Sequence, residues 1–184
     1  MQYYYYKKGK EQKFAEGVGS HDKKEKDINV VINCGNGGGE EESAAFRAVN
    51  GDVQTYGTPD EFVKVLFQVE QFDIGNVYNA NTSTFVPTEE GIYFVGGTVT
   101  FFPNDSTIPY RARVEIRVNG VSVAADNDFF NNIESFPYVN AINTSTVLQL
   151  QAGDLVEIFL TSTAPGIIDR NVSGISTRFE ASKF

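Results

Sequence analysis

Cysteine and histidine are almost missing from this chain of 184 residues, which contains one of each. The single cysteine, Cys34, has no partner for an internal disulfide, so no disulfide framework can hold the fold together. Histidine and thiolate side chains are the usual ligands of zinc and related metals, and none lies after residue 43. The sequence therefore predicts a domain without a bound cofactor.

Long apolar runs and an excess of positive charge are also missing. No stretch approaches the roughly 20 apolar residues that span a bilayer, and residues 1–8 lack the apolar core of a signal peptide. The formal net charge is −9, which disfavours contact with nucleic acid and with anionic membranes. We therefore expect no membrane insertion, no export by the general secretory route and no nucleic-acid partner.

A catalytic centre is not expected either. Ser20, His21 and Asp22 have the residue types of a hydrolytic triad, but they lie in a run of charged residues. A working triad needs a histidine that is held by packing and by a second hydrogen bond. Chance adjacency is the favoured interpretation, and we predict that the protein is not an enzyme.

The composition of the chain changes near residue 43. Seven of the nine lysines lie before it, whereas all six prolines and every arginine lie after it. Residues 7–27 are polar and charged, as in segments that cannot bury enough apolar surface to fold alone. We predict a mostly extended N-terminal arm over residues 1–43 and one folded domain over residues 44–184.

Within the arm, residues 28–33 form a short apolar segment, followed by a glycine-rich joint over residues 34–39. The apolar side chains of this segment are Ile28, Val30, Val31 and Ile32. A short strand on a tether is suited to pairing with an exposed sheet edge; a disordered tail with a chance apolar patch explains the composition equally well. Cys34 could link chains under oxidising conditions, or it could be an idle exposed thiol.

From Ala44 onward, apolar and polar residues alternate in short runs, a pattern typical of half-buried β-strands. The alternation is clearest over residues 110–118, and the following Asn119-Gly120 predicts a type I′ hairpin turn. Further strands are predicted over residues 62–72, 92–102, 147–151, 155–161 and 175–181. Many short strands with Gly, Asn and Pro turns indicate an all-β, two-sheet antiparallel sandwich.

One ordered pattern resembles the head domain of complement C1q, a member of the tumour-necrosis-factor-like (TNF-like) trimer superfamily. Phe67, Asp73, Tyr78 and Phe85 precede Gly91-Ile92-Tyr93 at intervals of five, four, six and five residues, and only Val95 departs from the usual aromatic pattern. Residues 118–121, 147–156 and 172–175 resemble later strands of the family. The likeness covers roughly residues 44–184, and it implies a TNF/C1q-like jelly roll that forms a non-enzymatic homotrimer.

Surplus apolar residues suggest where subunits could meet. In residues 155–160, Val156, Ile158 and Leu160 share one face, but Leu155 and Phe159 lie on the other. A second apolar face is typical of a subunit interface, although loops that cover a sheet edge would give a similar pattern. The candidates for the trimer core or interface are Phe67, Tyr93, Phe159 and Phe179.

An oxygen-ligated cation is the one metal for which the sequence offers a candidate. Asp126-Asn127-Asp128 alternates carboxylates with an amide on a predicted loop, but it lacks the glycine and distal glutamate of an EF-hand. A turn held by Asx hydrogen bonds is the favoured interpretation. We therefore predict no metal site.

Two functions remain open. The leading hypothesis is a homotrimeric structural subunit of an external surface layer or filament, in which the N-terminal arm links neighbouring subunits. Relatives without a signal peptide include proteins assembled onto bacterial spores, so the resemblance implies a spore surface as the location. The alternative is a trimeric recognition module that binds a receptor, a glycan or another ligand.

Overall fold

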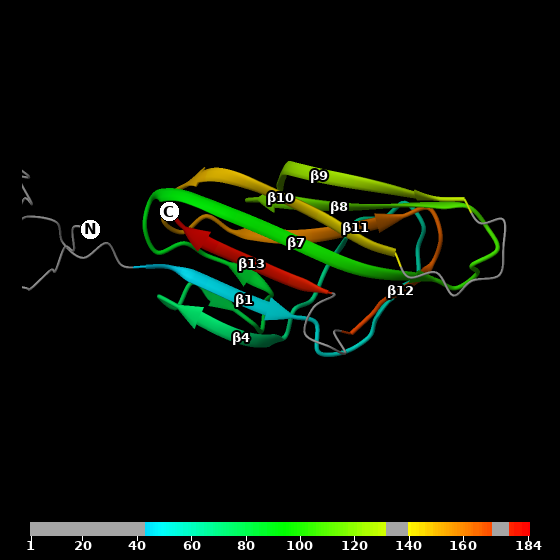
Figure 1. Ribbon diagram of the computed structural model, residues 1–184, viewed down its shortest axis with the longest axis horizontal. Coiled ribbons are helices and arrows are strands. Elements are labelled where there is room, and N and C mark those ends of the chain that lie inside the picture. The colour runs from blue at the N-terminus through cyan, green and yellow to red at the C-terminus, as the bar shows by residue number, and fades with distance from the viewer. Residues whose placement is uncertain (1–42, 132–139, 171–176) are drawn as a thin grey trace, which may run out of the picture. The chain divides into compact units, whose positions relative to one another are not determined.

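Two antiparallel β-sheets packed face to face make up the part of the chain that the computed structural model describes, residues 43–131, 140–170 and 177–184 (Figure 1). This part contains no helix, so the predicted all-β, two-sheet sandwich is confirmed. His21, Cys34 and the apolar segment 28–33 lie outside the described residues.

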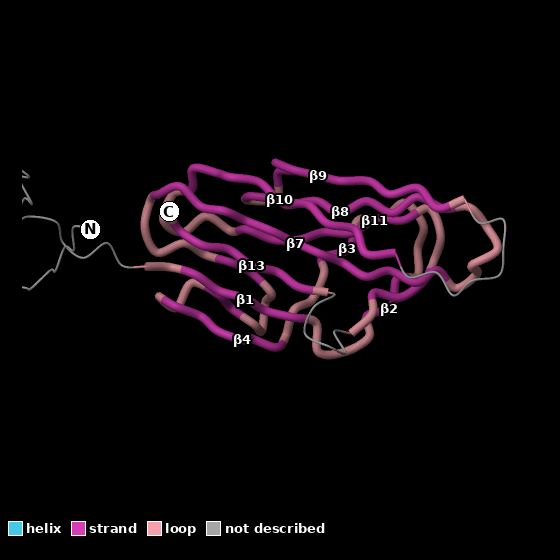
Figure 2. Tube along the Cα trace, viewed as in Figure 1, coloured by secondary structure: helices cyan, strands magenta, loops and turns pink. Residues whose placement is uncertain are grey.

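The first sheet has seven strands. They are β1 (Ala45–Val49), β2 (Gln54–Tyr56), β4 (Val69–Ile74), β7 (Gly91–Pro103), β10 (Asn140–Leu150), β12 (Gly166–Ile168) and β13 (Arg178–Lys183). The order is β2–β12–β7–β13–β1–β4, and β10 pairs with the other side of β7. Strands β10 and β4 therefore form opposite borders of this sheet (Figure 2).

The second sheet has six strands. They are β3 (Val63–Lys64), β5 (Tyr78–Asn79), β6 (Thr84–Phe85), β8 (Tyr110–Val118), β9 (Val121–Phe130) and β11 (Val156–Ser162). The order is β5–β6–β11–β8–β9, with β3 also paired to β11. Strand β9 ends this sheet and lies beside β10 of the first sheet, so one side of the sandwich is bordered by two edge strands (Figure 1).

The turn between β8 and β9 has the predicted geometry. Asn119 and Gly120 both adopt positive φ, 51° and 80°, as a type I′ hairpin turn requires. The Asn119 side chain also fixes this turn to the neighbouring one, since its Nδ2 donates to Asp154 Oδ1 at 2.9 Å and its Oδ1 accepts from the Leu155 N–H at 2.9 Å. The predicted strand over residues 110–118 coincides with β8.

Two predictions of local structure are wrong. The single strand predicted over residues 62–72 is two strands in different sheets, β3 and β4, and the chain between them crosses the core with Val65 and Phe67 fully buried. The predicted loop at Asp126–Asp128 lies within β9. An edge strand exposes most of its side chains, so it tolerates the charged residues that would mark a loop elsewhere.

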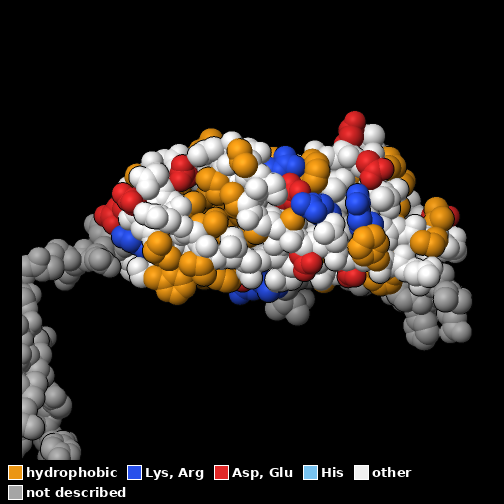
Figure 3. All heavy atoms as spheres, turned by 90° about the horizontal axis from the view of Figure 1, so that it is seen from above, with side chains coloured by type: hydrophobic (Ala, Val, Ile, Leu, Met, Phe, Trp, Pro, Cys, Tyr) orange, Lys and Arg blue, Asp and Glu red, His pale blue; other side chains and the backbone are white. Residues whose placement is uncertain are grey.

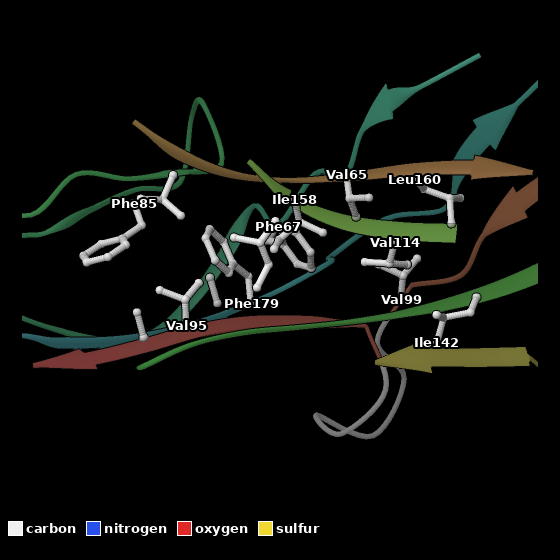
Figure 4. Close-up of a cluster of buried hydrophobic side chains, with 14 of the residues drawn as sticks. Val65, Phe67, Phe85, Val95, Val99, Val114, Ile142, Ile158, Leu160 and Phe179 are labelled. Carbon is white, nitrogen blue, oxygen red and sulfur yellow. The ribbon is translucent and has the colours of Figure 1, made fainter. Parts of the chain in front are cut away.

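The core lies between the sheets and is rich in aromatic rings. Figure 4 shows side chains of the second sheet, such as Ile158 and Leu160, pointing toward those of the first, such as Val99 and Phe179. Phe46 is at the centre of the aromatic part: its ring stacks on Tyr78 at 4.4 Å between centroids and meets the Phe179 ring edge-on at 4.9 Å.

The C1q-like spacing has a direct structural cause. Asp73, one residue before the end of β4, accepts hydrogen bonds from the N–H groups of Val77 and Tyr78, at 2.9 and 3.1 Å, so it holds the turn into β5. The Tyr78 hydroxyl then donates to the Phe67 carbonyl at 2.8 Å. Phe85 lies 5.2 Å from the Phe46 ring. The spacing therefore brings distant residues to one aromatic cluster.

Candidate assembly and recognition surfaces

An apolar row crosses the outer face of the first sheet. Residues directly opposite each other on paired strands share a face, and the strand registers place five residues in line. From β4 to β10 the row contains Ile74, Ala45, Ser182, Phe94 and Val147. Ile74 and Val147 are 49% and 56% exposed. We call these five residues the Phe94 row.

The neighbouring row lets Phe94 lie flat on the sheet. Gly96 comes next on this face of β7, and a Cβ atom there would lie 3.1 Å from Cζ of Phe94. The same row contains the Arg47–Glu180 pair, with 3.4 Å between Nε and Oε2. The glycine leaves this part of the face low in relief, and Glu180 offsets part of the positive charge of Arg47 and of Arg178, whose Nε lies 3.4 Å from Oε1 of Glu180.

Exposed apolar side chains extend beyond the Phe94 row. Val69 and Phe72 of β4 are 46% and 45% exposed, and Ile92 of β7 is 44% exposed. An antiparallel sheet in a monomer normally keeps one face polar. The first sheet is instead apolar on its inner face and at several places on its outer face, as is typical of a surface that meets a partner.

The open side of the sandwich lies next to this face. In the described part of the chain, β9 pairs only with β8, and β10 pairs only with β7. Such edges offer unpaired backbone N–H and C=O groups. Val121 of β9 is 67% exposed, and Figure 3, which looks onto the side of β9 and β10, shows apolar side chains among charged ones.

The outer face of the second sheet is charged instead. Glu115 of β8 is almost fully buried between two arginines: it accepts from Arg113 Nε at 2.8 Å and from Arg117 Nε at 2.9 Å. The Arg117 guanidinium also lies over two phenyl rings, 4.3 Å from the centroids of both Phe62 and Phe159. Cation–π contact and ion pairing therefore hold this face together.

Glu115 should make the stability of the domain depend on acid. Burial raises the pKa of its carboxyl, but hydrogen bonds and charge from Arg113 and Arg117 outweigh burial, so the net pKa is lowered. The unfolded chain therefore takes up this proton at higher pH than the folded one does. The resulting stabilisation is present above the unfolded pKa and is lost as the pH falls through the lowered folded value.

We expect Glu115→Gln to be less stable than the wild type at neutral pH and to lose less stability between about pH 5 and pH 2. Urea midpoints measured across that range test this, with Glu61→Gln, which changes an exposed carboxylate, as the control. Equal slopes for Glu115→Gln and the wild type would contradict the role given to the two arginines.

The aromatic candidates from the sequence lie at different depths. Phe67, Tyr93 and Phe179 are fully buried in the core. Phe159 lies on the outer face of the second sheet, paired opposite Glu115 and covered by Arg117, so its apolar ring already has a cover within the chain. Whether any of the four belongs to a trimer interface stays a prediction.

The sequence did not single out the residues that form the Phe94 row. One signal was present: residues 92–102 are apolar or small at nearly every position, which predicts a strand with two apolar faces. The alignment of Phe94 with Ile74 and Val147 could not be predicted from the sequence, because that alignment depends on the register of five strands.

Sites for small ligands are sparse in the described part of the chain. No group of three or more His, Cys, Asp or Glu side chains is placed to hold a metal ion there. An open depression of about 500 Å³, bordered by residues 76–81 and Val86, has a single carboxylate, Glu70. The described part of the chain also contains no helix that could span a membrane.

Comparison with known proteins identifies the fold. A scan against protein-family models and a search of curated proteins gave no match. A crystal structure of murine APRIL at pH 5.0 aligns with a TM-score of 0.53 and 16% identity, covering 77% of this chain and 99% of that one. The structure at pH 8.0 gives 0.54 and 15%, with the same coverage.

At this identity the similarity concerns the fold alone. The described domain has the TNF-like jelly-roll architecture of the APRIL structures. The fold class predicted from the C1q-like pattern is therefore confirmed.

Proposed function

We propose that the jelly-roll domain assembles into a homotrimer that works by binding and not by catalysis. The Phe94 row carries this proposal, because it leaves Ile74, Phe94 and Val147 on the outer face of a sheet whose inner face already forms the core. In a monomer those side chains would stay against water, whereas a second subunit would bury them.

The open side of the sandwich supplies a surface to cover the row. When the β9–β10 side of one subunit lies on the outer face of the next, the contact is heterologous, and three such contacts can close into a ring. This arrangement would also cover the unpaired backbone edges of β9 and β10, which invite aggregation when they are free, but not the outer face of the second sheet. One kind of contact, repeated three times, would cover both the Phe94 row and the β9–β10 edge of every subunit.

We further propose that residues 1–43 link neighbouring trimers into an external surface layer or filament. The support comes from the sequence: the apolar segment 28–33 has the composition of an edge-adding strand, and a glycine-rich joint separates it from the domain. The C1q-like resemblance supports a bacterial spore surface as the location. Cys34 would then be available for covalent links between chains.

A trimeric recognition module for a receptor, a glycan or another ligand is the second candidate function. The charged outer face of the second sheet favours it. This face lies on the other sheet from the Phe94 row, so a trimer built on the row would leave it available to a ligand.

Light-scattering mass of the full-length chain and of a chain that begins at residue 44 tests the proposals together. We expect trimers from the shorter chain, since the interface lies in the domain, and larger assemblies from the full-length chain. Trimers from both would reject the linking role of the arm and leave the recognition module. Monomers from both would reject the trimer.

A further inference from the structure

Arg111 differs from the other arginines of β8 because no hydrogen bond holds its guanidinium within the described residues. Its Nε is shielded from solvent without an acceptor. The nearest carboxylate oxygen, Oδ1 of Asp60, lies 3.6 Å from Nη2, which is too far for a hydrogen bond. Since the Asp60 side chain is 66% exposed, this ion pair is weak and can rearrange.

Arg113 lies on the same face of β8, two residues further along. The Nε of Arg113 donates a hydrogen bond to Glu115 Oε1 at 2.8 Å, whereas the terminal nitrogens of Arg113 make no hydrogen bond in the described part of the chain. The side chain is 33% exposed. Arg111 and Arg113 are about 7 Å apart along the strand, so their spare donors can reach one small anion together.

An exposed aromatic ring stands beside these guanidinium groups. Phe129 of β9 is paired directly opposite Arg111, and Asn127 is paired opposite Arg113, so all four side chains share the outer face. Phe129 is 74% exposed. The core does not need this ring, because its neighbour Phe130 is the one that stacks on Tyr110, at 5.5 Å.

We propose that Arg111, Arg113 and Phe129 form a binding site for an acidic sugar, a pyranose that carries one carboxylate. The carboxylate would take the free donors of the two guanidinium groups, which match its planar geometry. The apolar face of the sugar ring would lie on the Phe129 ring, which otherwise remains exposed to water. Asn127 would offer an amide to the ring hydroxyl groups.

Charge near the site favours a ligand with a single negative charge. Asp60 lies next to Arg111, and Asp126 and Asp128 alternate with the outward residues of β9. A chain with many acidic groups, such as a polyglutamate peptide, would bring further charges close to these carboxylates. One carboxylate on a neutral ring avoids that repulsion and uses the aromatic surface as well.

An NMR titration of the full-length protein with methyl glucuronide, and with the uncharged methyl glucoside and with acetate for comparison, tests the site. We expect saturable binding of the glucuronide, at least about tenfold tighter than that of either comparison compound. Arg111→Gln and Phe129→Ala should each weaken it by about tenfold. Asp60→Asn should strengthen it, because this change removes a competing carboxylate. Arg170→Gln, at an exposed arginine two residues after β12, should leave it unchanged.

Each of several results would overturn the proposal. Absence of saturable glucuronide binding would reject the site, and equal affinity for acetate would reduce it to a simple anion contact. Unchanged affinity in Phe129→Ala would remove the sugar ring from the contact. If Arg111→Gln lowers thermal stability, its effect on binding is not used, and the glucuronide affinity of Phe129→Ala alone tests the site. The Phe129 ring is exposed, so its removal should leave the fold intact. Trimer mass is measured separately, so a failure of the sugar site and a failure of the trimer can be told apart.

Discussion

Val147→Asp should convert the trimer into monomers without unfolding the domain. The Val147 side chain is 56% exposed on the outer face of β10, opposite Phe94. In an isolated subunit a carboxylate there would stay hydrated, so the fold should lose little stability. In the proposed interface the same carboxylate would be buried without a partner, which costs several kcal/mol. Three copies of that cost per assembly should abolish the trimer at micromolar concentration.

Light-scattering mass measures this loss, and circular dichroism shows whether the sheets remain. Leu155→Asp is the matched control, because Leu155 is similarly exposed, at 47%, but comes just before β11 in the second sheet. It should remain trimeric. A trimeric Val147→Asp, or a Leu155→Asp that dissociates as readily, would show that the Phe94 row is not the interface.

Local patterns sufficed to predict the elements whose two faces differ. Strand β8 alternates between apolar residues and the Arg113–Glu115–Arg117 series, so period two was visible. The Asn119-Gly120 turn was equally clear, because positive φ at two consecutive positions favours few other residue pairs. The C1q-like spacing predicted the jelly roll because it reflects packing: Phe67, Tyr78 and Phe85 all belong to the core.

Long-range geometry was beyond those patterns. Strand β10 begins at Asn140, well before the predicted residue 147. The prediction missed its first half because Asn, Ser and Thr make up most of it, and these residues are typical of turns as well as of edge strands. The chain changes sheet between β3 and β4, at Val65 and Phe67, without a break in the alternation of apolar and polar residues. The sequence therefore gave no sign that the predicted strand over residues 62–72 is two strands. Candidate surfaces were least visible: the Phe94 row and the pairing of Arg111 with Phe129 exist only through strand register.

Phe46→Ala should cause a large loss of folding stability. Phe46 is 1% exposed, and its ring contacts those of Tyr78, Phe85 and Phe179, with centroids 4.4 to 5.2 Å apart. Removing it opens a cavity among three rings that belong to different strands and cannot close together. The expected cost is about 3–5 kcal/mol, a large part of the total of about 5–15 kcal/mol for a domain.

Urea unfolding of the chain that begins at residue 44 measures this cost, at one fixed protein concentration because assembly adds to apparent stability. Phe62→Ala is the control, since Phe62 is 41% exposed and contacts Arg117 from the surface; it should cost less than about 1 kcal/mol. If the two variants lose equal stability, the aromatic cluster around Phe46 is not the main stabilising contact between the sheets. If only Phe46→Ala loses several kcal/mol of unfolding free energy, the C1q-like spacing has a physical explanation. Tyr78 and Phe85 of that spacing are then placed to contact the Phe46 ring, which lies on β1, outside the spacing.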